Sequence, residues 1–85
     1  MMVTLPASDY TMVLATLSAP IRKKLKLEAM EGADSVMFGD GVAADVYTEV
    51  MRYIALFGLT QDHAVTIKGR ELGLIAHSIF EQSGG

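Results

Sequence analysis

The clearest hydrophobic pattern in the chain lies between residues 42 and 57. Apolar residues recur there every three or four positions: Ala43, Val46, Tyr47, Val50, Met51, Ile54 and Phe57. Polar residues, among them Asp45 and Glu49, occupy the opposite side, which is typical of an amphipathic helix. Gly58 is placed to end the helix, because glycine terminates helices readily. We therefore predict a helix over 42–57, with Val50 and Ile54 in the core.

Weaker patterns predict three more helices. Ser8 and Asp9 are good N-caps for a short helix over 10–17. A second helix is expected over 19–31, because Pro20 is tolerated in a first turn and Gly32 can end it. The last helix follows Gly69 and turns five apolar residues inward: Leu72, Ile75, Ala76, Ile79 and Phe80.

Two short segments favour strands. Residues Ser35–Phe38 form a candidate strand before the turn Gly39-Asp40-Gly41, and Val65–Lys68 alternates as a half-buried strand does. The predicted fold class is mainly α: a small four-helix domain with a minimal β-hairpin before the last helix. We expect a single domain over 1–85, with residues 1–7 and 83–85 frayed.

The apolar content of the chain bears on its association state. Hydrophobic residues make up 51% of the 85 positions, and a chain this short buries only about 60–65% of its unfolded surface. Part of the apolar surface would therefore face water in a monomer, so we expect a homodimer. The candidate interface residues are Tyr47, Met51, Tyr53 and Phe80.

The absence of cysteine and of long apolar runs bears on location. Without cysteine the chain has no disulfide and no thiolate metal site, which agrees with a reducing compartment. No apolar stretch approaches the roughly 20 residues that span a bilayer. We expect a cytoplasmic protein with no membrane partner.

Charge is concentrated in one place. The net charge is −3, yet Arg22, Lys23, Lys24 and Lys26 fall within five residues of the second predicted helix. Such a run is either a solvated face or a contact for an anion, whether a phosphate backbone or an acidic protein surface. These four cations and Tyr53 are the candidate binding residues.

Patterns that would carry chemistry are weak. Gly39-x-Gly41-x-x-Ala44 has the local context of a dinucleotide-binding turn, but no second strand with a terminal acid follows it. The two histidines, His63 and His77, lack a metal-ligand spacing, and no serine lies in a nucleophile pattern. We expect no enzymatic activity, no catalytic residue, no cofactor and no metal.

Two segments are similar to known families. One segment resembles the second half of a winged-helix domain. It consists of a helix closing on Gly58-Leu59, a short hairpin and the run Val65-Thr66-Ile67-Lys68-Gly69-Arg70-Glu71-Leu72. That resemblance implies that the helix before the hairpin reads the major groove of DNA. It is here the helix that carries Asp45 and Glu49.

The second similarity lies in the last helix. Gly69-Arg70-x-x-Gly73-x-Ile75-Ala76-His77, with Glu81-Gln82 behind it, is similar to the closing helix of citrate synthases and of the related ATP-citrate lyase module. The resemblance implies that Arg70 would contact a substrate carboxylate.

The balance of these observations favours a binding protein. An acidic chain with excess apolar surface suits protein partners, which are recognised through desolvated apolar anchors. We expect a small non-enzymatic regulatory or inhibitor protein that binds another protein, as a homodimer. The alternative is a winged-helix DNA-binding transcriptional regulator.

Overall fold

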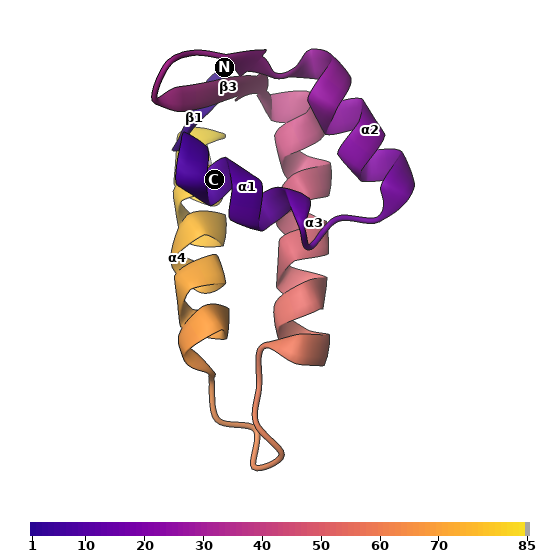
Figure 1. Ribbon diagram of the computed structural model, residues 1–85, viewed down its shortest axis with the longest axis vertical. Helices are drawn as coiled ribbons and strands as arrows, with labels where there is room; N and C mark the ends of the chain where they lie inside the picture. The colour runs from indigo at the N-terminus through magenta and orange to yellow at the C-terminus, as the bar shows by residue number, and fades with distance from the viewer. Residues whose placement is uncertain (85) are drawn as a thin grey trace.

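The computed structural model describes residues 1–84 and is mainly helical. In chain order its elements are β1 (Met2–Pro6), α1 (Ala7–Leu14), α2 (Ala19–Glu28), β2 (Met30–Glu31), β3 (Ser35–Gly39), α3 (Asp40–Phe57) and α4 (Ile67–Gln82). The predicted class, a small mainly helical domain with four helices, is confirmed. Figure 1 shows a small sheet at one end of the long α3–α4 pair, with α1 lying across that pair.

The sheet is antiparallel, in the order β1-β3-β2. Val3 lies opposite Phe38 and Leu5 opposite Val36, and all four side chains are buried. The alternation of buried and exposed residues shows that one face of the sheet packs on the helices. The prediction that residues 1–7 fray is therefore wrong, because Val3 and Leu5 complete the core from an edge strand. At the other end, Ser83 donates from its backbone to Ile79 in α4, and Gly85 lies outside the described residues.

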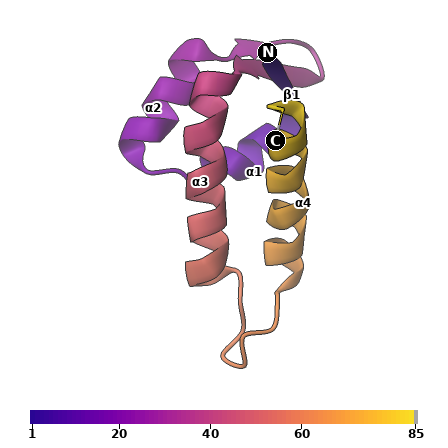
Figure 2. The ribbon, with the colours of Figure 1, turned by 180° about the vertical axis from the view of Figure 1, so that it is seen from behind.

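The core lies where α3 and α4 meet beneath the sheet. Val42, Ala43, Val46 and Val50 of α3 are buried, as are Leu72, Ile75, Ala76 and Ile79 of α4. Tyr10 and Val13 of α1 and Leu25 of α2 complete this cluster. In Figure 2, seen from behind, α1 passes behind α3 and α4 and α2 lies beside α3, so α1 covers one side of the pair only.

Several predicted boundaries are corrected. Helix α1 begins at Ala7 after Pro6, so Ser8 and Asp9 lie inside it and do not cap it. Helix α2 ends at Glu28 and not before Gly32, because Met30 and Glu31 pair with β3. Helix α3 begins at Asp40, directly after β3, and ends before Gly58 as predicted.

The segment before α4 contains less strand than the pattern indicates. A single antiparallel bridge joins Leu59 to Val65, and Ile67 and Lys68 already belong to α4. The reason is a local cap: the Thr66 hydroxyl accepts a hydrogen bond from the Gly69 backbone at 2.9 Å. Since such a cap satisfies a donor of the first helical turn, the helix begins right after Thr66.

The far half of the α3–α4 hairpin projects beyond α1 and α2 in both views (Figures 1 and 2). We call residues 51–74 the arm. Its tip is held by hydrogen bonds to the Gly58 carbonyl, from the Thr66 backbone at 2.8 Å and from the Thr66 hydroxyl at 2.9 Å. Gly69 packs directly on Gly58: a Cβ on Gly69 would overlap the Gly58 carbonyl group and lie 3.1 Å from its Cα. The arm is thus a built structure and not a loose loop.

Candidate protein interface

The structure divides the four candidate cations of α2. The Arg22 guanidinium donates to the Leu17 carbonyl at 2.8 Å, and the Lys24 ammonium pairs with the Asp45 carboxylate of α3 at 3.1 Å. Within residues 1–84, Lys23 and Lys26 make no ion pair. Two cations therefore anchor α2 to its neighbours, and two remain for a partner.

Lys23 and Lys26 lie one turn apart, so they share one face of α2. Together with Ala19, Arg22 and Leu27 they line an open groove of about 340 Å³. Leu27 is 78% exposed. We call these five residues the basic face. It combines a free apolar side chain with positive charge.

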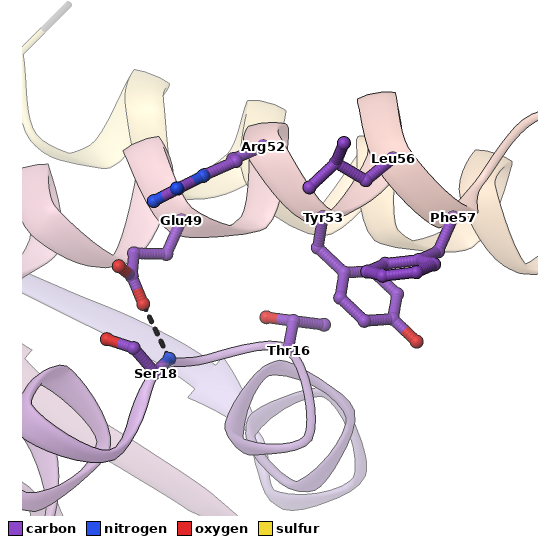
Figure 3. A pocket seen from close by; sticks show the side chains of 7 residues that line it. All are labelled: Thr16, Ser18, Glu49, Arg52, Tyr53, Leu56 and Phe57. Atoms are coloured by element: carbon purple, nitrogen blue, oxygen red, sulfur yellow. Dashed lines mark hydrogen bonds between the residues drawn. The ribbon is translucent and has the colours of Figure 1, made fainter.

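Tyr53 belongs to a different surface. It lines a groove of about 290 Å³ between the α1–α2 connection and the second half of α3, together with Thr16, Ser18, Glu49, Arg52, Leu56 and Phe57. Figure 3 shows the Tyr53 and Phe57 rings side by side, pointing from α3 toward Thr16. Their centroids are 5.0 Å apart, and the Lys68 ammonium lies 6.0 Å from the Tyr53 ring centre. We call this the α3 groove.

The α3 groove is apolar at one end and closed by a hydrogen bond at the other. Glu49 accepts from the Ser18 backbone at 2.7 Å, which ties the start of α2 to α3 (Figure 3). Leu56 and Phe57 are 65% and 67% exposed. The groove can therefore take an apolar side chain from a partner against Tyr53, Leu56 and Phe57.

A matching groove lies on the α4 side of α1. It measures about 250 Å³ and is lined by Asp9, Met12, Glu71, Leu74, Ile75 and Ser78. Leu74 is 67% exposed. Within the described residues neither Asp9 nor Glu71 forms an ion pair. We call this the α4 groove; it joins an apolar floor to two free carboxylates.

The other predicted interface residues lie elsewhere. The rings of Tyr47 on α3 and Phe80 on α4 are 5.5 Å apart, joining the two helices. Met51, one turn after Tyr47, is exposed. By helical spacing, Tyr47 and Met51 occupy the side of α3 away from Tyr53 and Leu56. The four candidates thus belong to two surfaces and not to one.

Three strongly exposed leucines are not among the residues predicted from the sequence to bind a partner: Leu27, Leu56 and Leu74. The signal was present in the sequence. Each is an apolar residue out of phase with the buried stripe of its helix, since Leu25, Val50 and Leu72 mark the inward direction.

Groups that could support catalysis are sparse in residues 1–84. No cluster of three or more metal-ligating side chains occurs there. A Cβ on Gly39 or Gly41 would meet only open space, so neither glycine is required by a close backbone approach. Among the helices described, none has both the length and the apolar character that a membrane crossing requires.

One buried polar group stands out. The Tyr10 hydroxyl is buried without a hydrogen-bond partner. Burial raises the pKa of Tyr10 above its ordinary value, and the negative charge of Glu31 adds to the shift. Tyr10 also lines a groove together with Lys26 and Glu31, but its hydroxyl is shielded from solvent.

The chain matches no protein-family model, and neither the curated proteins nor the solved structures contain a significant match to it. No family is therefore assigned, and the two resemblances stay predictions. In the structure, the winged-helix-like segment is a helix, a turn with one bridge and a second helix. Arg70, the residue singled out by the citrate synthase motif, is exposed on α4.

Proposed function

We propose that this protein is a small regulatory or inhibitor protein without catalytic activity, which acts by binding another protein and works as a homodimer. Its basic face on α2 contacts an acidic surface of the partner. The homodimer leaves this face free, because the remaining exposed apolar side chains lie on other elements.

The observation that carries the proposal is Leu27. It is 78% exposed and lies one turn after Lys23 and directly after Lys26, two lysines that make no ion pair within residues 1–84. Protein interfaces are organised around apolar anchors with a charged rim, and the rim charges speed association with a partner of opposite sign. An exposed leucine at the edge of a basic face fits this arrangement.

The same face suits DNA less well. Binding to a duplex is dominated by neutralised phosphates, and a leucine adds nothing to such contacts. Lys24 is already paired with Asp45, which reduces the cations available on α2. Helix α3, which the winged-helix resemblance would place in the major groove, packs against both α2 and α4.

The test uses the protein as bait in extract of the source cells, with captured proteins identified by mass spectrometry. Leu27→Asp, and Lys23→Glu combined with Lys26→Glu, should each lose the partner that the unaltered protein retains. Thr48→Glu is the control, because it adds a negative charge at an exposed position of α3 outside both the basic face and the arm, and should retain the partner. Equal capture by all variants would contradict the proposal.

A titration of the protein with duplex DNA distinguishes protein binding from the alternative, DNA binding. If Lys23 and Lys26 neutralise phosphates, binding should fall with salt at a log–log slope of about −2 and be negligible at physiological salt. Duplex binding by the unaltered protein that survives physiological salt would favour a DNA-binding transcriptional regulator instead.

A further inference from the structure

The arm presents an uncovered surface below α1. One side of α1 faces this surface. It carries Asp9 and Met12, and Thr16 just after the helix continues the same side, because the three residues are spaced at i, i+3 and i+7. The α4 groove begins at Asp9 and Met12, and the α3 groove begins at Thr16. Both grooves therefore belong to one corner, formed where α1 crosses the hairpin and the arm continues beyond it (Figure 1).

The arm and this corner carry complementary features on one face, with Lys68 and Glu71 one helical turn apart on α4. Near the tip, Ile67 is 82% exposed and is followed by Lys68, which makes no ion pair within residues 1–84. At the corner, the half-buried Met12 and the exposed Leu74 are flanked by the carboxylates of Asp9 and Glu71. Tip and corner thus have matching apolar surface and opposite charge.

We propose that two copies of this chain pair their arms face to face and antiparallel, with the tip of each arm in the corner of the other. A two-fold axis between the arms places Lys68 of one copy against Asp9 and Glu71 of the second copy, and repeats that contact by symmetry. The same operation lays α3 against α3, so that Tyr53, Leu56 and Phe57 of both copies form the centre. The result is a four-helix contact built from two hairpins.

A stable pairing needs an interface of standard size. A standard interface takes about 800 Å² from each partner, which is roughly 15% of the 5280 Å² exposed by one chain. The arm contains residues 51–57 of α3 and 67–74 of α4, about 10 Å and 12 Å of helix, and the underside of α1 extends the contact at both ends. Apolar patches of several hundred Å² on a small chain mark interaction sites.

A second copy fits the corner because one face supplies both halves of each contact. Lys68, the carboxylates of the α4 groove and the Tyr53–Phe57 pair all belong to the arm and its corner, and the antiparallel arrangement uses each of them twice. The inference rests on the homodimer in the proposed function and assigns its surface. It uses neither the basic face of α2 nor the Tyr47–Phe80 side of the hairpin.

The first experiment measures molar mass by light scattering at micromolar concentration. The unaltered protein should give about twice 9.2 kDa, and Phe57→Asp should raise the dimer dissociation constant by about a hundredfold, because it places a charge at the centre of the contact in both copies. Leu27→Asp is the matched control: it changes an exposed apolar residue on α2 and should leave the dimer intact. Circular dichroism confirms that each variant folds.

A charge exchange tests the orientation. Lys68→Glu and Glu71→Lys should each weaken the dimer by about tenfold, since each change acts twice and sets like charges against one another. The double variant Lys68→Glu, Glu71→Lys should recover most of that loss. Because the chain has no cysteine, a spin label on Gln61→Cys reports the tip alone, and antiparallel arms predict a long distance between labels.

The outcomes separate the two proposals. A dimer that is indifferent to Phe57→Asp and to the charge exchange, or a short distance between tip labels, would overturn the arm pairing and leave the homodimer. A monomer at every accessible concentration would overturn both the arm pairing and the homodimer. Partner binding by α2 would still be decided by the bait experiment.

Discussion

The two halves of α3 have the same apolar period and different surroundings. In the first half, Val42, Ala43, Val46 and Val50 are buried, whereas no residue from Met51 to Phe57 is buried. The difference is what lies above the helix. The sheet, α1 and α2 cover the first half, and the second half extends into the arm, where α4 is its main neighbour (Figure 2).

The comparison separates two meanings of an amphipathic pattern. In the body of the molecule the apolar stripe of α3 stabilises the fold, because burial removes it from water. In the arm a continuation of that stripe remains exposed on a backbone that hydrogen bonds hold in place. Apolar surface on an ordered backbone is available for a partner without a large ordering cost.

The largest expected effect compares two phenylalanines. Phe38 is fully buried under the sheet, and Phe57 is mostly exposed on the arm. Phe38→Ala should lower the free energy of unfolding by about 3–5 kcal/mol through lost burial and a cavity. Phe57→Ala should cost less than about 1 kcal/mol in the monomer, because it removes little buried area. Urea unfolding measures both losses of stability at a protein concentration too low for dimerisation. Equal losses for the two variants would contradict the distinction between body and arm.

A smaller effect compares two glycines of α4. Gly69 packs on the backbone of Gly58, whereas a Cβ on Gly73 would meet only open space. Gly69→Ala should therefore destabilise the protein by about 1–3 kcal/mol, since a backbone must move. Gly73→Ala should stabilise it by about 0.5–1 kcal/mol through helix propensity. Thermal unfolding of the pair would refute the close packing of the arm if both variants gained stability.

The smallest effect concerns Tyr10 in the body. Its buried hydroxyl lacks a partner, so Tyr10→Phe should be neutral or stabilise by up to about 1 kcal/mol. The raised pKa of Tyr10 in the folded state means that the folded protein keeps this proton longer than the unfolded chain. Stability should consequently fall as the pH rises above about 10, and this part of the fall should vanish in Tyr10→Phe. A marked loss of stability in the variant at neutral pH would show that the hydroxyl has a partner.

Individual helices and strands could be predicted from the sequence where their hydrophobic pattern extends over many residues. The helix expected over 42–57 begins two residues earlier and ends where Gly58 predicts. Val50 is buried as predicted, but Ile54 is only half-buried. Helical spacing predicts which side of a helix faces the core, but it does not predict how far along the helix the neighbouring elements extend. The strand β1 was missed because it carries two inward residues, Val3 and Leu5, and gains its register only from β3.

The candidate surfaces were less predictable for the same physical reason. Lys24 pairs with Asp45 only because α2 and α3 meet in the fold. The two residues are far apart along the chain, so the sequence alone did not predict this ion pair. The grouping of Tyr53 with Thr16 likewise depends on the position of α1. Leucines such as Leu56 could have been found from helical spacing alone, because they are apolar residues on the otherwise polar side of their helix.

The most direct test of the arm as the covered surface is a dilution series followed by backbone nuclear magnetic resonance. As the dimer dissociates, amide shifts should change along the arm and the underside of α1, with the largest changes at Tyr53, Leu56, Phe57 and Lys68. Amides of α2 around Leu27 should not change. Shifts that are constant on dilution, or that change only around Tyr47, Met51 and Phe80, would contradict the account.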